Sequence, residues 1–243
     1  MSLIKLINSL VRRFSDYIAL KTNLYLSHKP DMHTKLNNVK GWDDLYNFWI
    51  RNSPRNDKGD LVRLYFLLNQ LEYLKKNNIQ GFVAEVGVFK GTTARLFHQF
   101  LPDREILLFD TFEGFDERDI NHHKEDSGSH AGGWKTSLES VQAFIGKSSL
   151  VKLIPGYFPD TAKDVDPSNA YALVHLDADL YNPQIAGLEY FYPRVVKGGV
   201  IIIHDCNNEY FGSRKALDEF FIDKPETPII IPDKSGSAIV IKF

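Results

Sequence analysis

The sequence lacks most of the features that would place the protein outside the cytoplasm. Its 243 residues include a single cysteine, Cys206, which excludes an intrachain disulfide and favours a reducing compartment. No apolar run reaches the roughly 20 residues that a membrane-spanning helix needs, and no signal peptide is visible. The net charge is only −2, so the composition gives no general reason to expect nucleic-acid binding. We therefore predict a cytoplasmic protein that does not bind nucleic acid.

The composition that is present suits a globular α/β protein. Apolar residues make up 43% and charged residues 25% of the chain, which is ordinary for such proteins. The length suits one domain with a sizeable core and an extension. We assign residues 1–58 to an N-terminal helical extension and residues 59–243 to the main domain.

An amphipathic helix is predicted over residues 3–20. Its apolar residues recur at helical spacing, and across positions 1–29 five basic residues stand against one acidic residue. Such a helix can dock on its own domain or on a second subunit, or it can lie on an anionic membrane surface. We favour docking, and hence a homo-oligomer formed through the N-terminal helices, because interfacial helices are the less common use of this pattern. Peripheral membrane contact is the alternative.

Strands and helices alternate after residue 80. Helices are first expected at 42–50 and at 60–76, where Asp60 is the expected N-cap of the second. Apolar strands and intervening helices then predict a single doubly wound, mostly parallel, seven-stranded sheet of Rossmann-like type, covered on both faces and closed by a C-terminal β-hairpin. The expected strands are 82–86, 106–109, 151–154, 172–176 and 200–203, the helices 91–100, 137–146, 183–193 and 213–222, and the hairpin 228–231 with 238–243.

Residues 116–136 form a connection too long for a routine loop. The segment is polar and holds His123, His130 and Trp134. Long loops without secondary structure in compact domains are usually functional or disordered. We predict an active-site lid, whose His123, His130 and Trp134 could contact a substrate.

Carboxylates follow four of the predicted strands. Glu85, Asp110, Asp177 and Asp205 each lie at or just beyond a strand's carboxyl end, and in an open α/β sheet these ends line one crevice. Carboxylates gathered at one rim repel each other and lose hydration. Ribose hydroxyls, a cationic cofactor or a divalent metal would offset that cost.

Each of these residues also has a structural interpretation. Glu85 could pair with a lysine rather than bind a cofactor, and Asp110 could cap the turn at 111–114 rather than bind ribose. Asp177 and Asp179 stand two apart beyond the end of one strand, and we expect them to point in different directions. Of the two, we favour Asp177 as the functional one. His204 is evenly balanced between a metal ligand or base and a structural histidine.

Five stretches in order carry a family resemblance. The chain resembles class I S-adenosylmethionine-dependent methyltransferases, and most closely the macrocin O-methyltransferase family. The resemblance covers roughly residues 80–243, whereas residues 1–60 match nothing informative. The matching stretches are Glu-Val-Gly-Val-Phe-Lys-Gly (85–91), Phe-Asp-Thr-Phe-Glu-Gly-Phe (109–115), Ile-Pro-Gly-Tyr-Phe-Pro-Asp-Thr (154–161), Leu-Asp-Ala-Asp-Leu-Tyr (176–181) and residues 192–205, which end in Ile-Ile-Ile-His-Asp.

The resemblance implies a set of residues that bind S-adenosylmethionine. Glu85, Gly87 and Gly91 would hold its methionine end, and Asp110 would accept its ribose hydroxyls. The remaining implied cofactor residues are Thr92 at the start of the helix after the glycine turn, Thr111 and Phe112 near the adenosine, and Gly156 with Tyr157 beside the adenine.

The resemblance also implies a divalent metal that orients the acceptor hydroxyl. Its ligands would be Asp177, His204 and Asp205, and Asp177 would be the leading candidate for the catalytic base. The family usually has an acidic residue where this chain has His204. A magnesium site of oxygen ligands therefore becomes a mixed site that suits manganese or a later transition metal better; alternatively, the metal is lost and His204 is the base.

The expected activity is O-methylation of a hydroxyl on a sugar or a glycosylated metabolite. Two other classes of function stay as alternatives. A nicotinamide-dependent oxidoreductase could use a similar sheet, although the Gly-x-Gly-x-x-Gly pattern is missing. A non-catalytic binding protein could keep the fold, and His204 in place of an acid is its main support.

Overall fold

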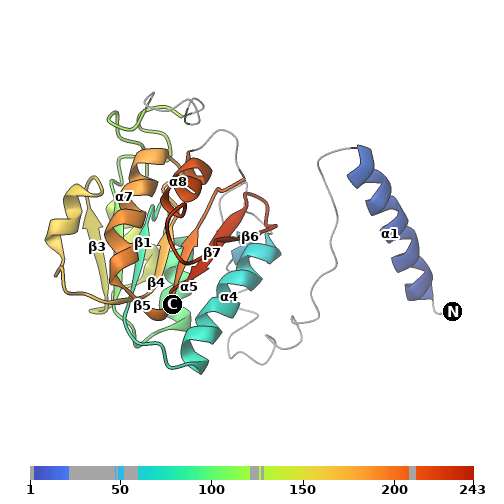
Figure 1. Cartoon of the computed structure of the whole chain (residues 1–243), viewed down its shortest axis with the longest axis horizontal. Helices are drawn as coiled ribbons and strands as arrows, with labels where there is room; N and C mark the ends of the chain where they lie inside the picture. Colours follow the sequence, from blue (N-terminus) through green and yellow to red (C-terminus); the bar gives the residue numbers. More distant parts are fainter. Residues whose placement is uncertain are drawn as a thin grey trace. The chain divides into compact units, whose positions relative to one another are not determined.

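Figure 1 shows a computed structural model of the protein. The chain divides into two units. The structure describes residues 3–21, 47, 49–51, 60–120, 126, 129–207 and 212–243, and the units are Met1–Asp44 and Leu45–Phe243. In the first unit, α1 spans Leu3–Lys21, as the periodicity predicts. Of the predicted helix at 42–50, only residues 47, 49 and 50 are described, and these are helical. None of the helices in the described ranges combines the length and the hydropathy needed to cross a membrane.

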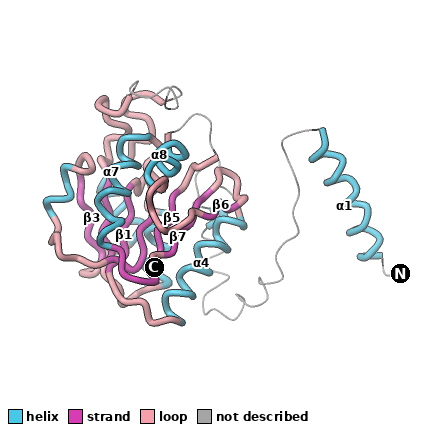
Figure 2. The backbone as a smooth tube through the Cα atoms, viewed as in Figure 1, coloured by secondary structure: helices cyan, strands magenta, loops and turns pink. Residues whose placement is uncertain are grey.

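A seven-stranded sheet forms the centre of the second unit (Figure 2). Its order is β3-β2-β1-β4-β5-β7-β6; the first five strands in that order run parallel, and β7 pairs antiparallel with both β5 and β6. This confirms the predicted sheet and its C-terminal hairpin. The strands are β1 (Phe82–Val86), β2 (Ile106–Asp110), β3 (Val151–Pro155), β4 (Tyr171–Leu176), β5 (Val195–Ile203), β6 (Ile229–Ile231) and β7 (Ser237–Ile241).

Helices cover both faces of the sheet. On one face α7 and α8 lie side by side (Figure 1), and Leu188, Phe191 and Leu217 pack there against strand residues such as Val174. Alternate strand residues face the other side, where Phe97 of α5 meets the ring of His175 edge-on at 5.7 Å. The helices are α4 (Leu61–Lys76), α5 (Thr92–Phe100), α6 (Leu138–Ile145), α7 (Tyr181–Phe191) and α8 (Ser213–Phe220), with short 3-10 turns at Asp160–Asp164 and Tyr192–Arg194.

Asp60 caps α4, as predicted, and also fastens it to the hairpin. The Oδ1 atom of Asp60 accepts the Arg63 N–H at 3.0 Å, and its Oδ2 atom accepts the Lys234 N–H in the β6–β7 turn at 2.7 Å. Trp49 Nε1 donates to the Asp60 carbonyl at 3.0 Å. These bonds place the first turn of α4, with Arg63, beside the carboxyl ends of the strands. Trp49, which the sequence assigns to the extension, belongs to the second unit.

The predicted lid is attached to the domain at its base and through Asp126. At the base, Phe115 N–H donates to the Gly133 carbonyl at 2.9 Å and Gly132 N–H to the Phe115 carbonyl at 3.0 Å. The fully buried Asp126 accepts the N–H of Gly212 at 2.6 Å and of Tyr181 at 3.2 Å. Neither α7 nor α8 has a side-chain cap from its own N-cap residue, so Asp126 supplies one to both.

Candidate active site

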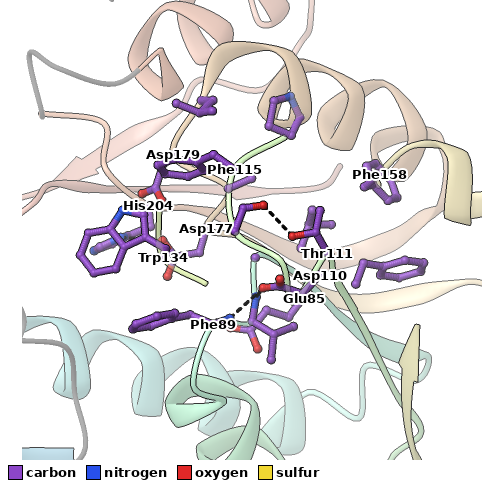
Figure 3. A pocket seen from close by; sticks show the side chains of 18 of the residues that line it. Glu85, Phe89, Asp110, Thr111, Phe115, Trp134, Phe158, Asp177, Asp179 and His204 are labelled. Atoms are coloured by element: carbon purple, nitrogen blue, oxygen red, sulfur yellow. Dashed lines mark hydrogen bonds and ion pairs between the residues drawn. The ribbon is translucent and has the colours of Figure 1, made fainter. Parts of the chain in front are cut away.

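A pocket opens at the carboxyl ends of the central strands, where the sequence places the site (Figure 3). Two of the predicted cofactor residues, Gly91 and Phe112, do not line it. His130 does not line it either, and His123 lies outside the described residues. The predicted residues that do line the pocket are Glu85, Gly87, Thr92, Asp110, Thr111, Trp134, Gly156, Tyr157, Asp177, His204 and Asp205.

Asp110 holds the glycine turn that follows β1. Its Oδ2 atom accepts the N–H groups of Val88 at 2.7 Å and Phe89 at 2.8 Å, and its Oδ1 atom accepts the Phe112 N–H at 2.7 Å. Burial raises the pKa of Asp110, although these three bonds oppose the rise. Asp110 therefore does cap the turns, as its structural interpretation predicts. A ribose hydroxyl that bound this carboxylate would share it with the backbone N–H groups of the turns.

Two of the glycines have packing reasons for their identity. Gly87 has a φ of +85°, and a Cβ atom there would lie 2.0 Å from the Asp177 carbonyl oxygen, so any side chain would push the β1 turn away from the end of β4. Gly91 has a φ of +78°, and its Cβ atom would press on Val141 and Ile145 of α6. Their conformations explain the glycines without a ligand.

Asp177, His204 and Asp205 meet at the end of β4 and β5. Asp177 Oδ1 lies 2.9 Å and Asp205 Oδ2 lies 3.0 Å from the same ring nitrogen, His204 Nδ1. The other ring nitrogen, Nε2, is buried and has no partner. Burial and Arg63 disfavour the imidazolium, yet the two carboxylates outweigh them and raise the pKa of His204 well above its usual range. The two carboxylates therefore favour the protonated form of the ring.

Arg63 is the functional residue that the sequence did not indicate. Its Nη2 atom lies 2.7 Å from Asp177 Oδ2, and its side chain is only 3% exposed. Burial disfavours the Asp177 carboxylate, but His204 and Arg63 together hold the pKa of that group well below its usual value. Part of the compensation that the four strand-end carboxylates require thus comes from the protein's own helix α4. The excess of carboxylates was the one signal that a cation should be nearby.

Glu85 pairs with a histidine, not with a lysine. Its Oε1 atom lies 2.9 Å from His175 Nδ1, because the two residues are register partners on β1 and β4. Its Oε2 atom is buried at the pocket and has no partner. Burial, followed by the charge of Asp177, raises the pKa of Glu85 well above its usual value. An ammonium group of a ligand would satisfy this oxygen.

Asp179 also reaches the pocket, so the expected divergence of Asp177 and Asp179 is wrong. Both residues lie beyond the end of β4, where Asp179 has a φ of +60° and no strand periodicity applies; within a strand, residues two apart would share a face. Burial, followed by the charge of Asp205, raises the pKa of Asp179 well above its usual value.

Aromatic rings and the lid border the rest of the pocket. Trp134 of the lid meets Phe89 of the glycine turn edge-on, with ring centroids 5.2 Å apart. On the side of β3, the Tyr157 hydroxyl donates to Asp119 at 2.8 Å, and Arg118 lies over the Tyr157 ring at 3.6 Å.

The Asp177, His204 and Asp205 side chains fit a divalent metal. Each offers one ligand atom, and these atoms all lie within 4.8 Å of one another. The separations of 2.9 and 3.0 Å around Nδ1 are those of hydrogen bonds and also of neighbouring ligands on one ion, for which metal–ligand distances of about 2.1 Å are typical. One imidazole with two carboxylates is a mixed donor set.

Comparisons with known proteins agree with this geometry. The sequence model of the macrocin-O-methyltransferase (TylF) family matches residues 60–237. The tetracenomycin-type "8-demethyl-8-(2,3-dimethoxy-alpha-L-rhamnosyl)-tetracenomycin-C 4'-O-methyltransferase" of Streptomyces olivaceus is 30% identical over 60% of this chain and 60% of its own length. "Mycinamicin III 3''-O-methyltransferase" of Micromonospora griseorubida is 29% identical over 60% of this chain and 63% of its own length.

The solved structures support the same fold. The O-methyltransferase NovP superposes with a TM-score of 0.64 at 23% identity, over 75% of this chain and 80% of that one. The regions matched in the two curated relatives span less than two thirds of the length of each relative. The family model matches most of this chain, from the N-cap of α4 to the start of β7. The chain belongs to the macrocin-O-methyltransferase (TylF) family.

Proposed function

We propose that the protein is an S-adenosylmethionine-dependent O-methyltransferase that acts on a hydroxyl group of a sugar or glycosylated metabolite. The observation that carries the proposal is one pocket that joins Glu85 and Asp110 to the Asp177, His204 and Asp205 cluster. Family membership and the activities for which the relatives are named support it. The single buried cysteine, Cys206, suits the cytoplasmic location that we propose.

The pocket residues fit the cofactor in chemical type. The unpartnered Oε2 atom of Glu85 would accept its ammonium group, and Thr92 begins α5, which has no side-chain cap and therefore presents N–H groups to an anion. Asp110 would bind the ribose while it holds the turn, and Gly156 and Tyr157 would border the adenine. When bound, S-adenosylmethionine supplies a methyl group that its sulfonium already activates.

The chain's own residues would then align and deprotonate the acceptor. A divalent ion held by Asp177, His204 and Asp205 would lower the pKa of the acceptor hydroxyl. Arg63 keeps Asp177 ionised and fixes one of its oxygens. A carboxylate with so low a pKa is a weak base, so Asp177 would accept the hydroxyl proton only from an acceptor whose own pKa the ion has lowered. Trp134 and Phe89 would exclude water from that side of the pocket and hold the acceptor in line with the methyl group.

Methyl transfer tests the proposal against its alternatives. The protein would be incubated with methyl-labelled S-adenosylmethionine, Mn²⁺ and a panel of unmethylated natural-product glycosides, and products would be identified by mass spectrometry. We expect label on a hydroxyl of at least one glycoside, and none with Asp177→Ala. Transfer that persists in Asp177→Ala would contradict the assigned base. Tight NADH binding without S-adenosylhomocysteine binding would favour an oxidoreductase, and binding of neither would favour a non-catalytic protein.

We further propose that α1 mediates self-association. Its apolar side chains Leu10 and Phe14 are 58% and 61% exposed, and a second copy of the helix would cover them. Leu10→Glu with Phe14→Glu in the full chain should convert a dimer to a monomer in sedimentation velocity. A monomeric wild type that co-sediments with anionic liposomes would instead establish membrane contact.

A further inference from the structure

A line of polar side chains runs through the second unit from the cofactor side of the pocket to its acceptor side, and three of its four members, Glu85, Arg63 and Asp177, line the pocket. Asp177 Oδ2 contacts Arg63 Nη2 at 2.7 Å, and the same Nη2 atom lies 3.5 Å from His175 Nε2. His175 Nδ1 lies 2.9 Å from Glu85 Oε1. Glu85 and His175 are at most 1% exposed, and the Arg63 side chain is 3% exposed. The line therefore joins two carboxylates that the sequence assigned to different halves of the site.

The donors along this line can be assigned from chemistry. A guanidinium has no acceptor atom, so Arg63 donates to Asp177 and presents only N–H groups to His175. His175 Nε2 must therefore be the unprotonated nitrogen, and the proton on Nδ1 is donated to Glu85 Oε1. At 3.5 Å the contact between Arg63 and His175 is long, so it orients the ring rather than binding it strongly. The edge contact with Phe97 at 5.7 Å restrains the same ring.

The carboxylates at the two ends of this line, Asp177 and Glu85, are held in the same way. At one end Arg63 occupies Asp177 Oδ2 while Oδ1 faces His204. At the other end His175 occupies Glu85 Oε1 while Oε2 lies at the pocket without a partner. Each carboxylate thus has one oxygen held from below and one left for the site. Removing Arg63 would leave His204 as the main group that favours the ionised form of Asp177 and would remove a positive charge that favours ionised Glu85.

On the basis of the proposed function, we infer that Arg63 and His175 are positioning residues that link the cofactor-binding carboxylate Glu85 to the acceptor-side carboxylate Asp177. Neither would touch the reacting atoms. Arg63 comes from α4, which precedes the first strand of the sheet, so a helix outside the strand-end motifs sets the geometry and the charge of both halves.

S-adenosylhomocysteine binding measured by calorimetry tests this link. Arg63→Met and His175→Phe should each weaken binding about tenfold, because each removes a member of the line that orients Glu85. Arg63→Lys keeps the charge but loses the forked geometry, so it should weaken binding by a smaller factor. Arg214→Met, which removes an exposed arginine paired with Asp218, should leave the affinity unchanged. Thermal melts would confirm that each variant is folded.

A double-mutant cycle separates positioning from a general structural role. Glu85→Gln alone should weaken binding, and adding Arg63→Met to it should cost less than a further twofold, because the effect of Arg63 passes through Glu85. The inference would be overturned if the losses of affinity caused by Glu85→Gln and Arg63→Met multiplied in the double variant. It would also be overturned if Arg63→Met bound S-adenosylhomocysteine as tightly as the wild type. A wild type that binds no S-adenosylhomocysteine would overturn the proposed function as well, so the two failures can be told apart.

Discussion

His204 is the residue that most distinguishes this pocket from an all-oxygen metal site. One ring nitrogen stands 2.9 and 3.0 Å from two carboxylates. The two carboxylates raise the pKa of the ring and so favour its protonated form, whereas as a ligand the ring must be neutral. A proton and a metal therefore compete for the same nitrogen.

Metal preference should follow from that histidine. We expect the wild type to bind Mn²⁺ at least tenfold more tightly than Mg²⁺, and His204→Asp to narrow or reverse this difference, because imidazole suits later metals and carboxylates suit magnesium. Calorimetric titration with each ion would measure it, with His130→Ala as a control outside the pocket lining. Full turnover after exhaustive EDTA treatment would show instead that His204 replaces the metal.

The strand-end carboxylates could be predicted from sequence because an apolar strand followed by an acid places that acid at one edge of the sheet. Asp177, Asp110 and Glu85 all line the pocket as expected. Arg63 could not be predicted, because it meets Asp177 across 114 positions of sequence and only the docking of α4 brings the two together. Asp179 was misplaced because it lies beyond the end of β4, where a residue with left-handed backbone follows no strand periodicity.

At the scale of elements, Asp126 connects the lid to two helices. Asp126→Ala should destabilise the protein by about 1–2 kcal/mol, because two helix N-termini lose their cap, and it should raise the acceptor KM more than kcat falls, because the lid loses its attachment. Denaturant unfolding and steady-state kinetics would measure these effects. Asp166→Ala, at an exposed turn, is the control. Unchanged stability and KM would show that the contacts of Asp126 do not hold the lid.

The C-terminal hairpin carries a pH-sensitive attachment. Glu226 accepts the Tyr192 hydroxyl at 2.5 Å, the Lys242 ammonium at 3.0 Å and the Phe243 N–H at 3.2 Å. Burial disfavours its charge, but these bonds prevail and lower its pKa to about 2. Because the folded pKa lies below the unfolded value, this stabilisation is complete above the unfolded pKa and is lost as the pH falls toward 2.

Glu226→Gln should remove that acid sensitivity. The free energy of unfolding of the wild type should fall between pH 6 and pH 3 by about 2 kcal/mol more than that of the variant. Urea denaturation at both pH values would measure the difference, with the exposed Glu189→Gln as control. If the free energy of unfolding fell equally in the wild type and in Glu226→Gln, other groups would control the loss of stability in acid.

At the scale of the whole molecule, the sheet and its hairpin follow from the alternation of apolar strands and helices, and the structure confirms both. The start of β5 at Val195 was missed, because Lys197, Gly198 and Gly199 interrupt the apolar run that marks its buried end. The ligand of the pocket depends on side chains that several strands, helices and loops contribute together. Its identity must therefore be established by a binding measurement.

The most direct measurement is calorimetric titration of the protein with S-adenosylhomocysteine. The wild type should bind one equivalent, and Asp110→Ala should bind at least about tenfold more weakly, because the cofactor loses an acceptor and three backbone N–H groups that hold the turn lose theirs. NADH should produce no binding heat. Absence of binding by the wild type, or an unchanged affinity in Asp110→Ala, would contradict the account.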